Sequence, residues 1–153
     1  MLKANFITAG EAAEKIADNS TVCTIGMTLV SASEAVLKAI EQRFEVSGHP
    51  ADITLVHSCG QSDRKDGIQH FSHEGLVKRI IGSHWGLQPK WMEMIAENKV
   101  EAYCLPQGQI AQLYRRMPCG LPGKMSKVRL GTFIDPRIEG GKMNDSTKSL
   151  PAI

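Results

Sequence analysis

Short runs of β-branched residues alternate along the chain with segments whose apolar residues recur every three or four positions. The apolar runs lie at residues 21–25, 53–57 and 100–105. The helical segments lie at about residues 9–17, 34–44, 89–95 and 109–116. The short runs predict buried strands, and the longer periodic segments predict amphipathic helices. Strands that alternate with helices predict an α/β domain with a three-layer αβα architecture and an open, mostly parallel sheet.

Local signals predict how several of these elements begin. Thr8 and Glu11 have the spacing of a capping box, and Ser31 and Glu34 repeat that spacing before the next helix. Pro89 suits the first position of a helix, where its missing N–H is not needed.

Other stretches are less regular. We expect a loop over residues 59–70, a helix over about residues 72–78 and an extended segment over residues 128–134. Residues 79–82 could end that helix or form a short strand, and the pattern leaves both open. Residues 140–153 are polar and hardly periodic, so they look like a tail or a cut edge.

Length and composition narrow the class of protein. A chain of 153 residues with 42% hydrophobic residues predicts one globular domain with a single sizeable core. A net charge of +2 from scattered basic residues gives no reason to expect a nucleic-acid or membrane partner. No apolar run approaches the ~20 residues that span a bilayer, and the N-terminus lacks a signal-peptide layout. Four cysteines without a CxxC pair favour free thiols and a cytoplasmic location.

The loops after the predicted strands are where a ligand would bind, because open α/β sheets bind ligands beyond the carboxyl ends of their strands. They carry Gly26-Met27, Gly60-Gln61 and Gln107-Gly108. Glycine lets the backbone approach a ligand, and free N–H groups there can bind an anion or a carbonyl oxygen. On the residues alone, ordinary tight turns explain these glycines at least as well.

Other candidate chemistry is weaker. His70 and His73, with His84 nearby, could suggest a metal, but no cysteine or carboxylate completes a zinc pattern, and we expect no metal site. Glu74 precedes a glycine, a step that can resemble a nucleophile motif, but its place at the start of the expected helix indicates a structural role. The chain contains no nucleophile elbow, P-loop or dinucleotide fingerprint.

Several motifs together resemble the acetate/propionate subgroup of the family I coenzyme A transferases, in its amino-terminal, α-subunit-like half. They are the stretch from Ser58 to Phe71, the Gly-Ser-His-Trp-Gly run at 82–86, Leu-Pro-Gln-Gly at 105–108, Gly-Thr-Phe-Ile-Asp-Pro-Arg at 131–137 and Gly-Gly-Lys-Met-Asn at 140–144. The resemblance implies an amino-terminal transferase domain over residues 1–148, followed by a divergent or truncated tail over 149–153.

What the resemblance implies for chemistry is a ping-pong transfer through a glutamyl-CoA thioester, with an acyl-CoA and a short-chain carboxylate as substrates and no permanently bound cofactor. The nucleophilic glutamate is expected in a second half or β-type subunit, so we expect no catalytic residue in this chain and no activity from it alone. Six residues match the family's oxyanion and substrate lining. They are Gly26, Met27, Gly60, Gln61, Gln107 and Gly108.

The resemblance weakens in the loop after the first strand, where Leu29 and Ser31 stand in place of the glycines that relatives carry. A positive φ at either residue would cost about 1 kcal/mol or more. A non-catalytic remnant that acts only as a binding or interaction module therefore remains an alternative, and a sugar-phosphate isomerase-like domain is a third, on fold analogy alone. An isolated half should also expose the apolar face that meets its partner, so we expect self-association.

Overall fold

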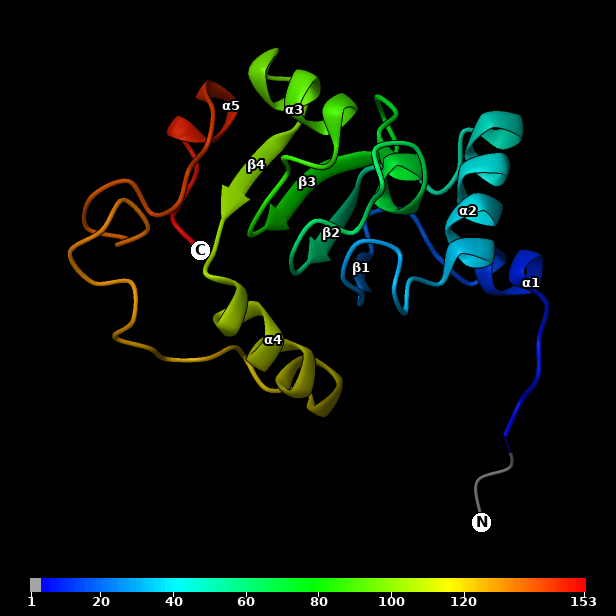
Figure 1. Cartoon of the computed structure of the whole chain (residues 1–153), viewed down its shortest axis with the longest axis horizontal. Helices are drawn as coiled ribbons and strands as arrows, with labels where there is room; N and C mark the ends of the chain where they lie inside the picture. Colours follow the sequence, from blue (N-terminus) through cyan, green and yellow to red (C-terminus); the bar gives the residue numbers. More distant parts are fainter. Residues whose placement is uncertain (1–3) are drawn as a thin grey trace.

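Four parallel strands form the centre of the molecule (Figure 1). The structure, a computed structural model, describes residues 4–153; residues 1–3, on which part of the prediction about the N-terminus rests, lie outside it. The strands β1 (Thr21–Thr24), β2 (Ile53–His57), β3 (Val77–Gly82) and β4 (Glu101–Cys104) pair in that order, each with its neighbour in parallel. The predicted α/β class with a parallel sheet is confirmed.

Helices cover both faces of the sheet, because alternate side chains of each strand point to opposite sides. Leu55 and Ile80 join the larger core cluster, which also holds side chains of α1 (Ala9–Glu14), α2 (Glu34–Ser47) and α3 (Pro89–Ala96). Val56 and Ile81 face the other way and pack with residues of α4 (Gln107–Arg116). The result is the expected three-layer arrangement.

The sequential strand order has a simple cause. The connections between successive strands run through α2, the 3₁₀ helix η1 (Gly67–Phe71) and α3, and all three contribute to the same core cluster. Right-handed crossovers on one face move the sheet one strand further each time. The carboxyl ends of all four strands therefore lie at one edge of the sheet, the edge toward which α4 lies (Figure 1).

The helix expected over residues 72–78 is wrong. The backbone turns there, with Gly75 at φ 87°, and β3 begins at Val77. The amides of Asp52 and Ile53 donate to the carbonyls of Gly75 and Leu76, at 2.9 and 3.0 Å, so pairing with β2 draws this segment into the sheet. Tertiary pairing thus resolves in favour of a strand what the local pattern left open at residues 79–82.

Two loop predictions need correction. The region 59–70 is not a loop throughout, since η1 begins at Gly67. Residues 128–134 form successive turns and not an extended segment. The buried carboxylate of Asp135 accepts the backbone N–H of Gly131 at 2.8 Å, and Gly131 has φ 78°, so this side chain folds the backbone into a turn.

Of the three predicted helix starts, two are confirmed and one is wrong. The capping box of Thr8 and Glu11 is confirmed, with both reciprocal hydrogen bonds present. The capping box at Ser31 and Glu34 is wrong: the N-cap of α2 is Ser33, with no side-chain cap, and Ser31 lies outside the helix. The carboxylate of Glu34 instead accepts the backbone N–H of Gly67 at 3.0 Å. Pro89 is the first residue of α3, as predicted.

The last residues pack against the body of the protein. A short helix α5 (Asp145–Lys148) buries Thr147, and the carbonyl of Pro151 accepts the hydroxyl of Tyr103 at 3.1 Å. Ile153 packs beside the α4 core cluster. The division of the chain at residue 148 stays a prediction.

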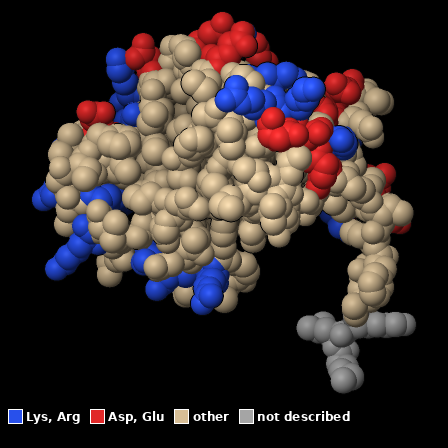
Figure 2. Space-filling view, viewed as in Figure 1, with Lys and Arg blue, Asp and Glu red and all other residues tan. Residues whose placement is uncertain are grey.

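The surface is uneven in charge and polarity. Figure 2 shows basic side chains along the lower edge, where α4 lies in Figure 1, and acidic ones gathered at the top. Residues 102–134 contain five basic residues and no acidic one. Many of the exposed large apolar side chains lie in two segments, residues 25–30 and 121–133. Within residues 4–153, no helix has the length and hydrophobicity needed to cross a bilayer.

Candidate functional site

Segments that follow three of the strands lie at the carboxyl end of the sheet. Gly26 follows β1, Gly60 follows β2, and Gln107 begins α4 directly after β4. The amide of Thr28 donates to the carbonyl of Gly60 at 3.0 Å, so the first two segments touch. The structure therefore places the Gly26-Met27 and Gly60-Gln61 segments in contact and puts Gln107-Gly108 at the same end of the sheet, after the outer strand β4.

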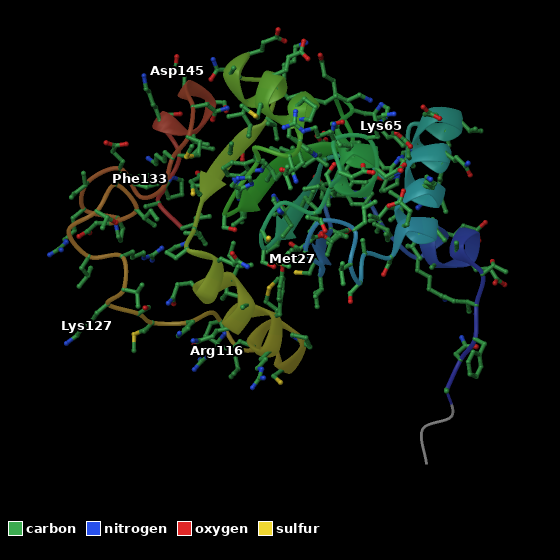
Figure 3. The ribbon with its side chains drawn as sticks, in the orientation of Figure 1. Met27, Lys65, Arg116, Lys127, Phe133 and Asp145 are labelled. Atoms are coloured by element: carbon green, nitrogen blue, oxygen red, sulfur yellow. The ribbon has the colours of Figure 1, made fainter. Side chains whose placement is uncertain are left out.

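The segment after β1 forms a tight hairpin. Met27 and Val30 exchange backbone hydrogen bonds of 3.1 and 2.9 Å. Gly26 has φ 154°, and a β-carbon there would lie 3.0 Å from the carbonyl oxygen of Val30, so glycine is required. The N–H of Met27 is already used inside the hairpin, so it can bind an oxyanion only if the hairpin opens. Figure 3 shows Met27 at the edge of the sheet that faces α4.

Of the two hairpin residues that stand where relatives carry glycines, Leu29 and Ser31, the structure has a positive φ at Ser31 but not at Leu29. Thr28 and Ser31 have φ values of 51° and 63°, whereas Leu29 is not among the residues with positive φ. An L-residue in that region costs about 1 kcal/mol or more, and the hydrogen bonds of the hairpin offset part of that cost.

The segment after β2 is buried. The side chain of Gln61 is fully buried and donates to the carbonyls of Thr24 and Ser58, at 2.8 and 3.2 Å. Gly60 is also buried, and a β-carbon on it would lie 3.2 Å from the His84 ring and from the Gln88 amide. The Gln61 side chain thus fixes the backbone at the ends of β1 and β2 by hydrogen bonds inside the protein, and it does not line an open surface.

The segment after β4 offers an accessible polar side chain. Gln107 and Gly108 are exposed in the first turn of α4, with Pro106 as the N-cap. No hydrogen bond of the Gln107 side chain is found in the described part of the chain, so its amide is available to a ligand.

A tyrosine that the sequence reading missed joins these segments. The hydroxyl of Tyr114, on α4, donates to the carbonyl of Thr24 at 2.9 Å and accepts the amide of Ser58 at 2.5 Å. Burial raises the pKa of this phenol, which keeps it a neutral donor. The sequence offered one signal for this residue: Tyr114 lies seven residues, or two helical turns, after Gln107, and so on the same side of the helix.

A buried histidine packs behind the segment that follows β2. His57 ends β2, and its Nδ1 lies 2.9 Å from the carbonyl oxygen of Cys59. Burial lowers the pKa of His57 to about 4, so the ring is neutral and Nδ1 donates. A β-carbon on Gly82 would overlap this ring, and the ring of Trp85 meets it edge-on with centroids 6.0 Å apart.

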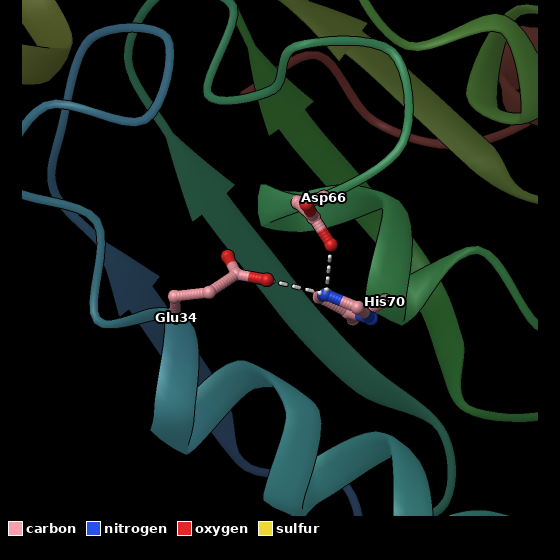
Figure 4. A group of neighbouring side chains, drawn as sticks. All are labelled: Glu34, Asp66 and His70. Carbon is pink, nitrogen blue, oxygen red and sulfur yellow. Dashed lines mark hydrogen bonds and ion pairs between the residues drawn. The ribbon is translucent and has the colours of Figure 1, made fainter.

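Two of the histidines considered for a metal, His70 and His73, belong instead to a cluster of charged and polar side chains between α2 and η1, and Figure 4 shows His70 with Glu34 and Asp66. Nε2 of His70 lies 2.7 Å from Glu34 Oε1 and 3.5 Å from Asp66 Oδ1. The ammonium of Lys38 lies 3.3 and 3.4 Å from the same two oxygens. A cation of the protein already occupies the position between these carboxylates, so the geometry gives no reason to assign a metal there.

A third carboxylate, that of Glu41, belongs to the same cluster. Glu41 binds His70 Nδ1 at 2.5 Å and His73 Nε2 at 2.7 Å. Burial opposes its ionisation, but the hydrogen bonds from the two rings together outweigh burial and lower the pKa of Glu41. His84 lies apart from this cluster, beside Gly60. Glu74 is an exposed turn residue paired with Lys99 at 2.6 Å, not the first turn of a helix.

Comparison with known proteins agrees with this architecture. The model of the coenzyme A transferase family matches residues 6–151. The caffeate CoA-transferase of Acetobacterium woodii is 41% identical over 145 residues, which cover 94% of this chain and 28% of that protein. The acetate CoA-transferase YdiF of Escherichia coli K12 is 35% identical over 144 residues, 93% of this chain and 27% of that protein.

A solved structure extends the agreement to the fold. The crystal structure of the acyl-CoA transferase YdiF apoenzyme from Escherichia coli O157:H7 superposes with a TM-score of 0.85 at 33% identity, over 93% of this chain and 28% of that one. This chain thus spans a little over a quarter of the length of these relatives, in their amino-terminal half. With the family's pattern matched along nearly its whole length, the chain belongs to the coenzyme A transferase family.

Proposed function

We propose that this chain supplies one wall of the active-site cleft of an acyl-CoA:carboxylate CoA-transferase and that a second half carries the attacking glutamate. The observation that supports this most is that the Gly26, Gly60 and Gln107 segments all follow strands of one parallel sheet and lie at its carboxyl end, in a chain of this family. The exposed amide of Gln107 is suited to hydrogen-bond the acyl group of a thioester bound there.

The proposed reaction proceeds through covalent intermediates. The glutamate of the second half attacks the thioester carbonyl, which expels CoA thiolate and leaves an acyl-glutamyl anhydride. The thiolate then attacks the glutamyl carbonyl and releases the first carboxylate. A second carboxylate attacks the glutamyl-CoA thioester, and CoA finally returns to the new acyl group, which restores the glutamate. Donors at the strand ends, with Gln107 among them, would stabilise the oxyanions on this path.

Charge supports the substrate class. Coenzyme A is anionic, and the stretch of residues 102–134 beside the Gln107 segment carries five basic and no acidic residues. Short-chain acids such as acetate, propionate or acetoacetate are the proposed acyl groups. A cytoplasmic location, where acyl-CoA is available, completes the proposal.

Exchange of CoA between acetyl-CoA and propionate tests the reaction. We expect no turnover by the purified chain and turnover after co-expression with the remaining part of a related acetate CoA-transferase. In the active complex, Gln107→Ala should lower kcat, whereas Gln112→Ala, on the same exposed helix, should not. Turnover by the chain alone would refute the absence of a nucleophile.

The alternative, a remnant that only binds, is favoured by one observation: the N–H of Met27 is bound within the hairpin and not free. Failure of the wild-type chain to gain activity with any supplied second half, while still binding it, would support this alternative.

Self-association of the isolated chain follows from its exposed hairpin. Ile25, Met27 and Val30 are 61%, 59% and 68% exposed. We expect a dimer in sedimentation at micromolar concentration, and a shift toward monomer in the double variant Met27→Ser/Val30→Ser. Val46→Ser, at an apolar residue 90% exposed on α2, is the control. A monomeric wild-type chain would contradict the expectation.

A further inference from the structure

Tyr114 connects parts of the protein that are distant in the sheet. It lies on α4, the helix that follows β4. The strands β4 and β1 are the two outer strands of the sheet, on opposite sides of β2 and β3. The Tyr114 hydroxyl nevertheless reaches the last residue of β1, Thr24, and the first residue after β2, Ser58. The ring packs within the core cluster on the α4 face.

Each of these contacts leads directly to a segment of the candidate cleft. Thr24 lies two residues before Gly26, and Ser58 lies two residues before Gly60. Tyr114 itself lies two turns after Gln107 on the same helix. One hydroxyl group therefore holds all three segments in a fixed relation.

Few other hydrogen bonds could replace this one, although apolar side chains also pack α4 against the sheet. The Gln61 side chain and the Thr28 amide link the first two segments to each other, but neither reaches α4. In the described part of the chain, the remaining hydrogen bond from β1 to the end of α4 is the 3.6 Å contact of the Cys23 thiol with the Met117 sulfur, which is a weak donor and acceptor pair.

We infer that Tyr114 is a positioning residue, whose hydroxyl sets the place of Gln107 relative to the Gly26 and Gly60 loops. The inference rests on the proposed function, since it concerns the geometry of that cleft. Tyr114 itself touches no substrate in this account; it acts through the backbone of the loops and through the helix that carries Gln107.

Tyr103 provides a matched control. It is likewise a tyrosine whose hydroxyl donates to a backbone carbonyl, that of Pro151, and it is fully buried. That hydrogen bond joins β4 to the last residues of the chain, and none of the three segments takes part in it. Tyr103→Phe and Tyr114→Phe remove the same chemical group, keep the ring and its packing, and differ in whether the cleft loses a contact.

Amide hydrogen exchange of the isolated chain, read residue by residue by NMR, tests the inference without any assay of turnover. In Tyr114→Phe we expect the Ser58 amide to exchange about tenfold faster, since it loses its acceptor. The Gly60 amide should shift its resonance, while Ile80 in the centre of β3 changes less than about twofold. Tyr103→Phe should leave Ser58 and Gly60 unchanged. Unchanged exchange at Ser58, or an equal increase at Ile80, would overturn the inference.

Kinetics of the complemented enzyme give the second test. Tyr114→Phe should lower kcat and leave the KM for propionate nearly unchanged, because the loops are misaligned and not lost. Tyr103→Phe should change neither. A raised KM with an unchanged kcat would count against positioning. If the complemented wild-type enzyme shows no turnover, the proposed function fails, and the exchange experiment still decides whether Tyr114 couples the three segments.

Discussion

Acidification should destabilise the protein through His57, whose ring is fully buried at the end of β2. In the unfolded chain this imidazole takes up a proton near its ordinary pKa of 6.5, whereas in the folded chain burial lowers its pKa to about 4. Between these values the unfolded state binds more protons than the folded state. The free energy of unfolding therefore falls as the pH drops from 6.5 to 4, and the contribution is fully retained above pH 6.5.

The size of the effect follows from the two pKa values. At about 1.4 kcal/mol for each pH unit between 6.5 and about 4, the loss approaches about 3 kcal/mol at pH 4. The hydrogen bond to Cys59 opposes the shift, and the nearby His84 adds slightly to it. A loss of this size is a large part of the stability of an ordinary domain.

Urea denaturation at intervals between pH 7 and pH 4 measures this slope. The control is His57→Asn, whose amide nitrogen can still donate to the carbonyl of Cys59 but does not titrate. The variant will be less stable at pH 7 because it leaves a cavity, but its stability should fall by about 3 kcal/mol less than that of the wild type. Equal slopes in the two proteins would refute the reasoning, as would an NMR titration of the wild-type ring with a midpoint near 6.5.

Two further substitutions test other parts of the structure. Glu41→Gln removes the charge that binds His70, and we expect a loss of about 2 kcal/mol in the free energy of unfolding at pH 6, measured by urea denaturation; an unchanged midpoint would contradict it. Gly82→Ala forces a β-carbon into the ring of His57 and should cost about 3 kcal/mol, whereas Gly108→Ala, with open space around it in the first turn of α4, should leave the melting temperature unchanged or slightly raised. Equal melting temperatures for the two alanine variants would argue against the packing described here.

The sequence predicted elements well where local and tertiary preferences agree. The β-branched runs of β1 and β2 and the apolar stripe of α3 are such cases, because each packs the face that its own pattern presents. The prediction of a helix at 72–78 was wrong because the helical pattern there competes with backbone pairing to β2. That strand lies about twenty residues earlier in the chain, so a local pattern does not show the pairing.

The candidate site was predictable in the same partial way. The positions of Gly26, Gly60 and Gln107 after predicted strands were enough to predict that they lie at the carboxyl end of the sheet. Their role as site residues came from the family resemblance and stays a prediction. That the Gln61 side chain turns inward could not be found, and neither could the reach of Tyr114, because both depend on which strands become neighbours. Contacts across 90 residues, such as that of Tyr114 with Thr24, leave no local periodicity.

The two core clusters differ in size, which implies that one layer of the protein unfolds locally more often than the other. Among residues 4–153, the cluster on the side of α1, α2 and α3 contains sixteen buried residues, whereas the cluster on the side of α4 contains four. Cooperative units with few buried contacts open more often than the rest of a protein. Helix α4 should therefore detach, with loss of the Tyr114 hydrogen bonds, in sub-global fluctuations that leave the other layer folded. Such opening would let the segment that bears Gln107 adjust to the proposed second half.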